Sequence, residues 1–375
     1  MAGRAAFVYD EELLKYDFGP FHPLKPERVL LAFRLIEALG LLDNEGSCLC
    51  KPRMASLDEL LLFHTPEYVK EIQQASLEGI GRLDQGDTPA FKGCYEVSCL
   101  VAGATLKALD LVMTEAFEHA FNASGGLHHA RRDRASGFCI FNDAAIGIAY
   151  LMKRYDLKRI MYVDMDAHHG DGVMYGFYND PRLLDIDFHE DGQFLFPGTG
   201  EVSEIGEGSA RGLKINIPLS PMSSDTSFIY AFDRLVPRLA KKFKPEFIVL
   251  QCGADAHRGD EIAHLGLTTK AYEHTASVIH EIAHKTCGGR LVVLGGGGYN
   301  LSNACRCWSV VYERLADIWC SEEIPKAWRE YFQSLTGETA PSHLYDTETQ
   351  HLRKENQVPK DILQTIHQIE TIIGD

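Results

Sequence analysis

Short apolar runs alternate along the chain with longer segments in which apolar residues recur about every 3.6 positions. Apolar runs bounded by Gly, Asp or Asn are typical of buried strands, and the longer period is typical of amphipathic helices. The runs predict strands at residues 5–9, 120–124, 160–164, 183–188, 213–217, 247–251 and 291–294. The longer segments predict helices at about residues 27–42, 95–117, 142–155, 224–243, 268–285 and 302–319.

This alternation is typical of βαβ units and predicts an α/β fold, with an open, mostly parallel sheet that carries helices on both faces. No linker, internal repeat or low-complexity stretch divides the sequence. We therefore expect one domain over residues 1–375, with its core at about 5–320 and a peripheral helical tail at about 321–375. Ligands of such sheets bind beyond the carboxyl ends of the strands.

The composition is that of an ordinary globular protein, with 375 residues and 45% hydrophobic content. We expect no membrane segment, because no apolar run approaches the roughly 20 residues that span a bilayer, and no signal peptide, because the N-terminus soon turns charged. The ten cysteines are scattered, which favours reduced thiols and a cytoplasmic location. The net charge of −16 argues against nucleic acid as a direct partner, because that binding depends on basic patches.

The densest group of chemically active residues lies at 164–173, with the sequence Asp-Met-Asp-Ala-His-His-Gly-Asp-Gly-Val. Because residues two apart in a strand point to the same side, we expect Asp166 and His168 to project together from a strand end. A carboxylate oxygen and an imidazole nitrogen are ligands of divalent metal ions. Asp164 and Asp171 then remain as partners for other groups. The alternative is a charged turn that only joins a strand to a helix.

Other strand ends carry side chains that would complete a catalytic site. His128 and His129 follow the strand at 120–124, and with two spare carboxylates they suggest a pair of Asp–His dyads. Asp255 follows the strand at 247–251 and is a plausible third metal ligand. Tyr299 follows four glycines, which let the backbone approach a ligand closely, and its hydroxyl suits a developing oxyanion.

Together these segments resemble the zinc-dependent histone deacetylase family, and within it the bacterial acetoin-utilisation deacetylases. The matching motifs are Gly-Gly-Leu-His-His-Ala at 125–130, Ser-Gly-Phe-Cys at 136–139, Asp-Met-Asp-Ala-His-His-Gly-Asp-Gly at 164–172, Phe-Pro-Gly-Thr-Gly at 196–200, Cys-Gly-Ala-Asp at 252–255 and Gly-Gly-Gly-Gly-Tyr at 295–299. The resemblance extends from Tyr16 to about Trp308. It implies the arginase/deacetylase-like version of the α/β fold, with the active site at the carboxyl ends of the strands.

The resemblance implies a metal centre in which Asp166, His168 and Asp255 hold zinc. Fe(II) is a further candidate, because two aspartates and one histidine are not the commonest ligands of zinc. A structural potassium ion would bind Asp164 and the backbone carbonyls of Asp166 and His168.

The implied reaction removes an acetyl or other acyl group from the ε-amine of lysine in proteins and releases acetate. The alternative substrate is a small acetylated amine such as a polyamine. The implied dyads are His128 with Asp164 and His129 with Asp171. We expect His129 to act as general base and then acid, His128 to contribute electrostatically, and Tyr299 to stabilise the oxyanion.

The resemblance also implies the residues that bind substrate. Gly137, Phe138 and Phe196 would line a narrow tube for the acetylated lysine arm. Asp87 would lie at the rim and accept hydrogen bonds from substrate backbone, with an ordinary turn aspartate as the alternative. Arg28 would lie near the cavity through which acetate leaves.

Two positions depart from the family pattern. Asp187 replaces a serine that contributes to the potassium site in many relatives. Ile262 follows Glu261 where the family often has Pro-Leu or Pro-Met in the pocket wall, which leaves the pocket width open.

Other interpretations compete with the deacetylase. Residues 280–284 read His-Glu-Ile-Ala-His, the H-E-x-x-H signature of zinc proteases, but no third ligand is evident and we expect this helix face to lie in solvent. A dinuclear ureohydrolase of the arginase fold would need a second aspartate two residues after Asp255, where this chain has His257. A non-catalytic scaffold would have lost a ligand or Tyr299, and all of them are present.

Overall fold

The computed structural model describes residues 3–42, 46–346 and 358–374, and within them eight parallel strands form one sheet in the order β2-β1-β3-β8-β7-β4-β5-β6. The strands are β1 (Gly3–Val8), β2 (Ser47–Cys50), β3 (Phe117–Asn122), β4 (Ile160–Asp164), β5 (Leu183–Glu190), β6 (Lys214–Leu219), β7 (Phe247–Gln251) and β8 (Leu291–Leu294). The α-helices are α1 (Glu27–Ala38), α2 (Leu57–Leu60), α3 (Pro66–Glu78), α4 (Cys94–Met113), α5 (Asp143–Arg154), α6 (Asp171–Gly176), α7 (Asp225–Phe243), α8 (Thr269–Cys287), α9 (Leu301–Ala316), α10 (Lys326–Thr336) and α11 (Lys360–Ile373).

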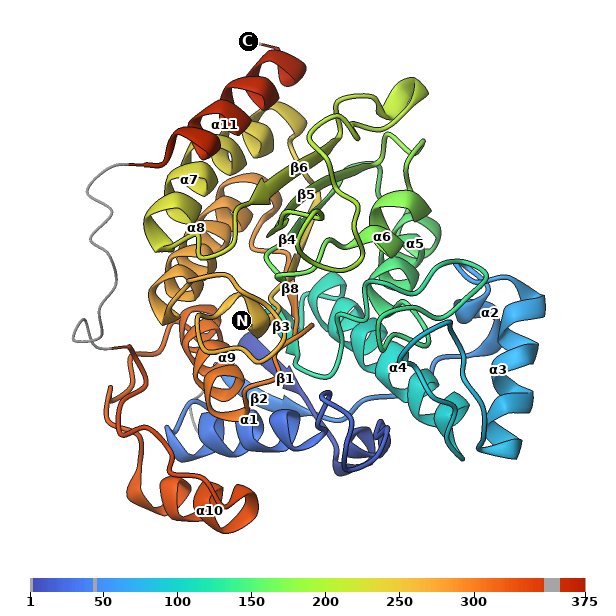
Figure 1. The fold of residues 1–375 in the computed structure, drawn as a ribbon, viewed down its shortest axis with the longest axis vertical. Helices are drawn as coiled ribbons and strands as arrows, with labels where there is room; N and C mark the ends of the chain where they lie inside the picture. Colours follow the sequence, from blue (N-terminus) through green and yellow to red (C-terminus); the bar gives the residue numbers. More distant parts are fainter. Residues whose placement is uncertain (1–2, 43–45, 347–357, 375) are drawn as a thin grey trace.

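Helices cover both faces of this sheet (Figure 1). The helices α1, α9, α8 and α7 lie side by side on one face, and α4 and α5 pack together on the other. This arrangement confirms the predicted α/β class with an open parallel sheet. In the described part of the chain, no helix is both long and apolar enough to cross a membrane.

The structure differs from the predicted elements in several places: helices α2, α3 and α6 were not predicted, and α1 ends at Ala38, before the predicted residue 42. The edge strand β2 was not predicted, because its run of four residues, Ser-Cys-Leu-Cys, is too short to show a periodic pattern. Strand β3 begins at Phe117, where the predicted helix still continued, because α4 already ends at Met113. His119, a polar residue before the apolar run, is therefore part of the strand and is buried.

The register of the central strands brings their carboxyl ends to one edge of the sheet. Asp164 at the end of β4 pairs with Gln251 at the end of β7. Gln251 pairs with Leu294 of β8, which in turn pairs with Asn122 of β3. The loops that leave these four strands therefore start side by side, as parallel topology requires.

The last two helices of the chain pack on different parts of the fold (Figure 1). Helix α10 lies against α1, where the Trp328 indole N–H donates to the Leu31 carbonyl at 3.1 Å. Helix α11 lies against α7, where Arg234 Nε donates to Glu370 Oε1 at 2.7 Å. Both helices thus extend layers that the preceding core has already formed.

Trp308 of α9 connects the helical layer to the loop after β7. Its side chain is fully buried, and the indole N–H donates to the Cys252 carbonyl at 2.9 Å. The guanidinium of Arg28 lies 5.4 Å from the centre of the ring. This contact fixes the start of the segment that leads to Asp255.

We expect Trp308→Phe to lower the free energy of unfolding by roughly 1–3 kcal/mol, because the buried Cys252 carbonyl loses its donor. Urea unfolding of purified protein measures this change. The matched control is Trp319→Phe, at a position that is 76% exposed, which we expect to change stability by less than about 0.5 kcal/mol. Equal stability of the two variants would contradict a structural role for the indole hydrogen bond.

Candidate active site

Three buried side chains that can bind a metal ion converge at the carboxyl edge of the sheet. Asp166 and His168 follow β4, and Asp255 lies in the turn after β7. His168 Nδ1 lies 2.9 Å from Asp255 Oδ2 and 3.2 Å from Asp166 Oδ1. One ligand atom from each residue lies within 4.8 Å of the others. Two buried carboxylates and one imidazole offer the donors and the negative charge that a divalent cation requires.

Backbone N–H groups from neighbouring loops orient the two carboxylates. The Gly297 N–H donates to Asp166 Oδ2 at 2.6 Å, and the Ala167 N–H donates to Asp255 Oδ1 at 2.9 Å. A Cβ atom at position 297 would lie 2.0 Å from Asp255 Oδ2, so only glycine fits there. The glycine run before Tyr299 therefore serves the close approach of backbone to these carboxylates.

Two Asp–His pairs lie beside Asp166, His168 and Asp255. His128 Nδ1 lies 2.8 Å from Asp164 Oδ2, and His129 Nδ1 lies 2.8 Å from Asp171 Oδ1. The Nε2 atoms of the two rings face each other at 3.1 Å, and His128 Nε2 lies 3.8 Å from Asp166 Oδ1. The structure thus pairs each histidine with the carboxylate that the resemblance implied.

The two rings have opposite electrostatic environments. Burial disfavours charge on both, but Asp164 and Asp166 outweigh burial at His128 and raise its pKa to about 10. At His129, burial and the neighbouring His128 lower the pKa to about 4, although Asp171 opposes the change. His128 is therefore the cationic ring and His129 the neutral ring at pH 7.

The hydroxyl of Tyr299 remains protonated beside these groups. Burial, together with the charges of Asp255 and Asp166, raises the pKa of Tyr299 well above its usual value. Its ring centre lies 5.8 Å from that of Phe138 in an edge-on arrangement. A neutral phenol in this position is a hydrogen-bond donor, which is what a developing oxyanion requires.

The predicted tube residues lie close to His129 and Tyr299. The ring of Phe196 lies 5.1 Å from the His129 ring, and Phe138 packs against Tyr299. Gly137 has φ of 54°, and a Cβ atom there would lie 2.6 Å from His129 and 2.8 Å from Phe196. A side chain at 137 would therefore block the approach to His129, which explains the glycine.

Arg28 is buried and lines the same small cavity as His128, His129 and Tyr299. Its Nη1 donates to the Gly296 carbonyl at 2.6 Å, and burial lowers its pKa. A cavity of about 20 Å³ lies beside it, enough for about one water molecule. The cavity is lined by Leu24, Arg28, Gly126, Leu127, His128, His129, Gly137, Cys139, Asp166, Gly296, Gly297 and Tyr299.

Asp87 is exposed on a turn that another aspartate shapes. Oδ1 of Asp84 accepts the backbone N–H groups of Gly86 and Thr88, each at 3.0 Å. Thr88 Oγ1 in turn accepts the N–H of Phe138 at 3.0 Å, which attaches the turn to the tube wall. Asp84 therefore shapes this turn, and the role of Asp87 at the rim stays a prediction.

Asp187, which departs from the family pattern, is hydrogen-bonded to a residue of the neighbouring loop and to a residue of its own strand. Its Oδ2 accepts the Gly170 N–H at 2.7 Å, and its Oδ1 lies 2.7 Å from His189 Nδ1. Asp164 lies beside it at the same register of the next strand. The extra carboxylate is thus hydrogen-bonded at both oxygens.

Sequence reasoning missed two charged residues that support the site. Oδ2 of Asp260 accepts the Tyr299 N–H at 2.8 Å, and Oδ1 accepts the N–H of the half-buried Ile262 at 3.0 Å. Arg131 forms a 2.6 Å ion pair with Asp171 Oδ2, on the side away from His129. Neither residue belongs to a motif that stands out in a single sequence.

A third missed residue, Asp143, holds the loop that carries the paired histidines. Its buried carboxylate accepts the N–H groups of Gly126 and Leu127 at 3.0 and 2.8 Å. The neighbouring Asn142 donates through Nδ2 to the carbonyl of His128 at 2.9 Å. The available signal was the adjacent Asn and Asp at a predicted helix start. Such residues normally only cap the helix, so their second role in holding the loop was not evident from the sequence.

The ureohydrolase alternative lacks its second carboxylate site. His257 Nε2 lies 2.9 Å from Asp346 Oδ2, so the ring is engaged outside the metal-binding group. Asp346 also accepts from Arg306 Nη1 at 3.0 Å and from the Thr269 N–H at 2.9 Å.

The structure corrects one expectation about the H-E-x-x-H segment of α8. Glu281 points to solvent and pairs with Lys285, so it does not serve as a base. However, the view that this segment lacks a third ligand is wrong, because buried His119 of β3 meets His280 and His284.

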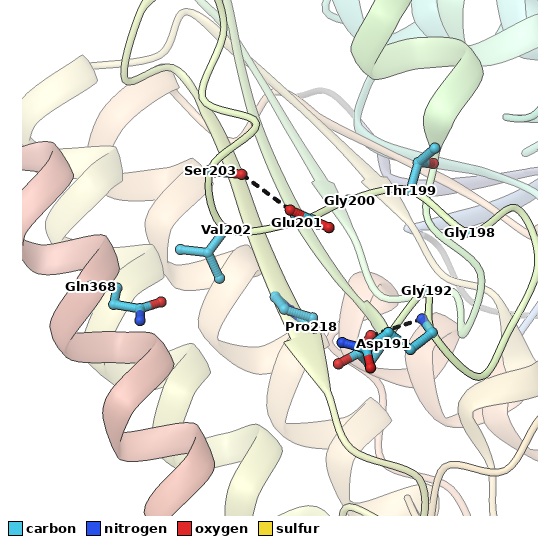
Figure 2. Close-up of a pocket in the computed structure, with 11 residues that line it drawn as sticks. Asp191, Gly192, Gly198, Thr199, Gly200, Glu201, Val202, Ser203, Pro218 and Gln368 are labelled. Atoms are coloured by element: carbon cyan, nitrogen blue, oxygen red, sulfur yellow. Dashed lines mark hydrogen bonds between the residues drawn. The ribbon is translucent and has the colours of Figure 1, made fainter.

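A larger surface cavity of about 420 Å³ is lined in part by residues 198–203, the loop that follows Phe196 (Figure 2). Figure 2 shows Gln368 of α11 facing this cavity from the side opposite the loop. His169 Nδ1 lies 2.8 Å from Thr199 Oγ1, and His189 Nε2 donates to the Gly200 carbonyl at 2.9 Å, which anchors the loop. The cavity lining is Asp191, Gly192, Gln193, Gly198, Thr199, Gly200, Glu201, Val202, Ser203, Pro218 and Gln368, without any predicted site residue.

The histone deacetylase domain matches residues 22–315 of the chain. The acetoin utilization protein AcuC of Bacillus subtilis (strain 168) is 39% identical over 353 residues, which cover 91% of this chain and 90% of that protein. The protein of the same name from Staphylococcus aureus (strain MSSA476) is 35% identical over 354 residues, covering 92% of this chain and 90% of the relative. Both the match and the geometry at the carboxyl edge of the sheet lead to one conclusion: the chain belongs to the histone deacetylase family and is a deacetylase, a hydrolase.

Proposed function

We propose that this deacetylase is zinc-dependent and hydrolyses the acetyl amide on the ε-amine of lysine side chains in proteins. The observation that carries the proposal is the convergence of the ligands Asp166, His168 and Asp255 with two Asp–His dyads and Tyr299. We further propose one domain, in which the described helices α10 and α11 complete the layers of the core. The ten free cysteines support a reducing compartment, the cytoplasm.

Asp166, His168 and Asp255 would hold the ion, because they are the buried oxygen and nitrogen donors of the site. When bound, a divalent ion lowers the pKa of a water molecule towards about 7 and polarises an amide carbonyl. Zinc is the first choice and Fe(II) the second. For a structural potassium ion we propose Asp164 with the backbone carbonyls of Asp166 and His168.

The protein's own groups would then move the protons. Neutral His129, held through Nδ1 by Asp171, would accept the proton of the attacking water and return it to the leaving amine. Cationic His128 would stabilise negative charge nearby. The Tyr299 hydroxyl would donate a hydrogen bond to the oxyanion, a contribution worth roughly 3–4 kcal/mol in comparable sites.

The residues of the tube and its rim are relevant to the choice between a peptide and a polyamine substrate. The narrow passage past Gly137 and Phe196 suits an extended amide-bearing chain, which both acetyl-lysine and acetylated polyamines possess. Exposed Asp87 favours a peptide, because a rim carboxylate accepts backbone N–H groups. Comparing kcat/KM of the zinc-loaded enzyme for acetyl-lysine peptides and acetylated polyamines tests the proposal, and a preference for polyamines would replace it with the alternative.

Two substitutions should separate metal binding from oxyanion stabilisation. We expect Asp255→Ala to lose both stoichiometric zinc and hydrolysis, because one of only three protein ligands is removed. Tyr299→Phe should keep the zinc but lower kcat by about 10²–10³, the usual effect of removing one oxyanion donor. Zinc analysis and turnover of both proteins provide the measurement. Stoichiometric zinc and near-normal turnover in Asp255→Ala would show that the ligand assignment is wrong.

The two histidines should differ in their effect on catalysis. We expect His129→Ala to lower kcat at least as much as Tyr299→Phe, because the proton acceptor is lost. His128→Ala should reduce kcat less, since it removes only electrostatic stabilisation. Steady-state kinetics on one acetyl-lysine peptide measure both, with zinc content as the control for an intact metal site. A larger loss in His128→Ala would reverse the assigned roles.

Asp87→Ala should raise KM for acetyl-lysine peptides about tenfold or more, as expected for losing hydrogen bonds to a charged group worth roughly 1.5–3 kcal/mol. KM for acetylated polyamines, which lack a peptide backbone, should barely change. Asp84→Ala is the matched control, because it breaks the turn itself and should impair both substrates. An equal loss for both substrates in Asp87→Ala would mean that Asp87 supports architecture and does not recognise peptide.

A further inference from the structure

A second group of metal-binding side chains lies at the opposite end of the sheet from the candidate active site. His119 is near the start of β3, and His280 and His284 lie one turn apart near the end of α8. His284 Nε2 lies 2.9 Å from His280 Nε2 and 3.3 Å from His119 Nε2. All three ligand atoms lie within 4.8 Å of one another. Nitrogen ligands around a tetrahedral zinc ion are separated by a similar distance, about 3.3 Å.

Hydrogen bonds among the rings do not account for this convergence. A ring nitrogen either donates one proton or accepts through one lone pair. His284 Nε2 faces the Nε2 atoms of both His280 and His119. It can form one well-aligned hydrogen bond, so the remaining Nε2 atom has no hydrogen-bond partner within the group. A metal ion at the centre would use the lone pairs of all three nitrogens at once.

The environment of His119 and His280 lowers the pKa of both rings and favours their neutral form, which supports metal binding. Burial, together with the neighbouring His280 and His284, lowers the pKa of His119 to about 3. Burial and His284 also lower the pKa of His280, although Asp317 and Glu118 oppose the change. Neutral imidazoles are metal ligands, whereas protonated ones are not.

We propose that His119, His280 and His284 form a second metal site, which binds a divalent transition-metal ion such as zinc. His119 is buried and His284 is exposed, so one coordination position would face solvent and hold water. The site joins the end of α8 to strand β3 and would stabilise that contact. It is not a protease centre, because Glu281 pairs with Lys285 and, with it, lines a groove against α7.

This site is tested by titrating zinc into the metal-stripped protein in a calorimeter. Elemental analysis then measures how much zinc the protein retains. We expect two binding events in the wild type and only one in the double variant His280→Ala with His284→Ala. The double variant should keep its deacetylase activity. His119→Gln should weaken the second event at least tenfold. If that buried change prevents folding, the double variant at the surface still decides the question.

His274→Ala is the matched control, because it removes another histidine from α8 that pairs with Asp233 outside the group. This variant should retain both binding events. A single event in the wild type, or two events in the double variant, would overturn the proposal. Equal loss in His274→Ala and the double variant would also overturn it, because it would indicate unspecific binding by surface histidines.

Discussion

The structure depends on burying several carboxylates close together at one edge of a parallel sheet. Asp164, Asp166, Asp171, Asp187 and Asp255 are all buried there. An unpaired buried ion costs several kcal/mol, so each of these groups needs a compensating partner. The partners come from every part of the fold: histidine rings, the guanidinium of an arginine, and backbone N–H groups that only glycine allows so close. A divalent cation held by Asp166 and Asp255 would compensate the remaining charge.

The need to compensate each buried carboxylate makes the electrostatic environments of the two Asp–His dyads different, although their geometries are alike. The carboxylate of Asp164 faces only neutral donors besides His128, which therefore carries the positive charge. The carboxylate of Asp171 is also paired with Arg131, so its pull on His129 is weaker. A cationic ring beside it and burial then keep His129 neutral. The proposed division into a base and an electrostatic partner thus rests on the other groups that contact the two carboxylates.

The sequence predicted the class of the fold and the residues that meet at its carboxyl edge, because periodicity and strand ends are local features. It did not predict β2, whose four residues are too few to show a periodic pattern. It also missed Asp260 and Arg131, because their partners are distant in the chain and no local pattern marks them, and Asp143, because its position at a helix start indicated only a helix cap. For Asp87 and Asp84, the turn was visible, but only the structure shows which carboxylate shapes it.

His119 shows how a polar residue that interrupts an apolar pattern carries information. In the sequence it shortened the predicted strand, whereas in the structure it is a buried member of β3. Burying an imidazole without full use of its nitrogens is unfavourable. The candidate active site meets this requirement for His128 and His129 by giving each ring a carboxylate. The Nε2 atom of His119 instead faces the Nε2 atom of His284 and lies near that of His280, and a metal ion is the partner that we propose for these three nitrogens.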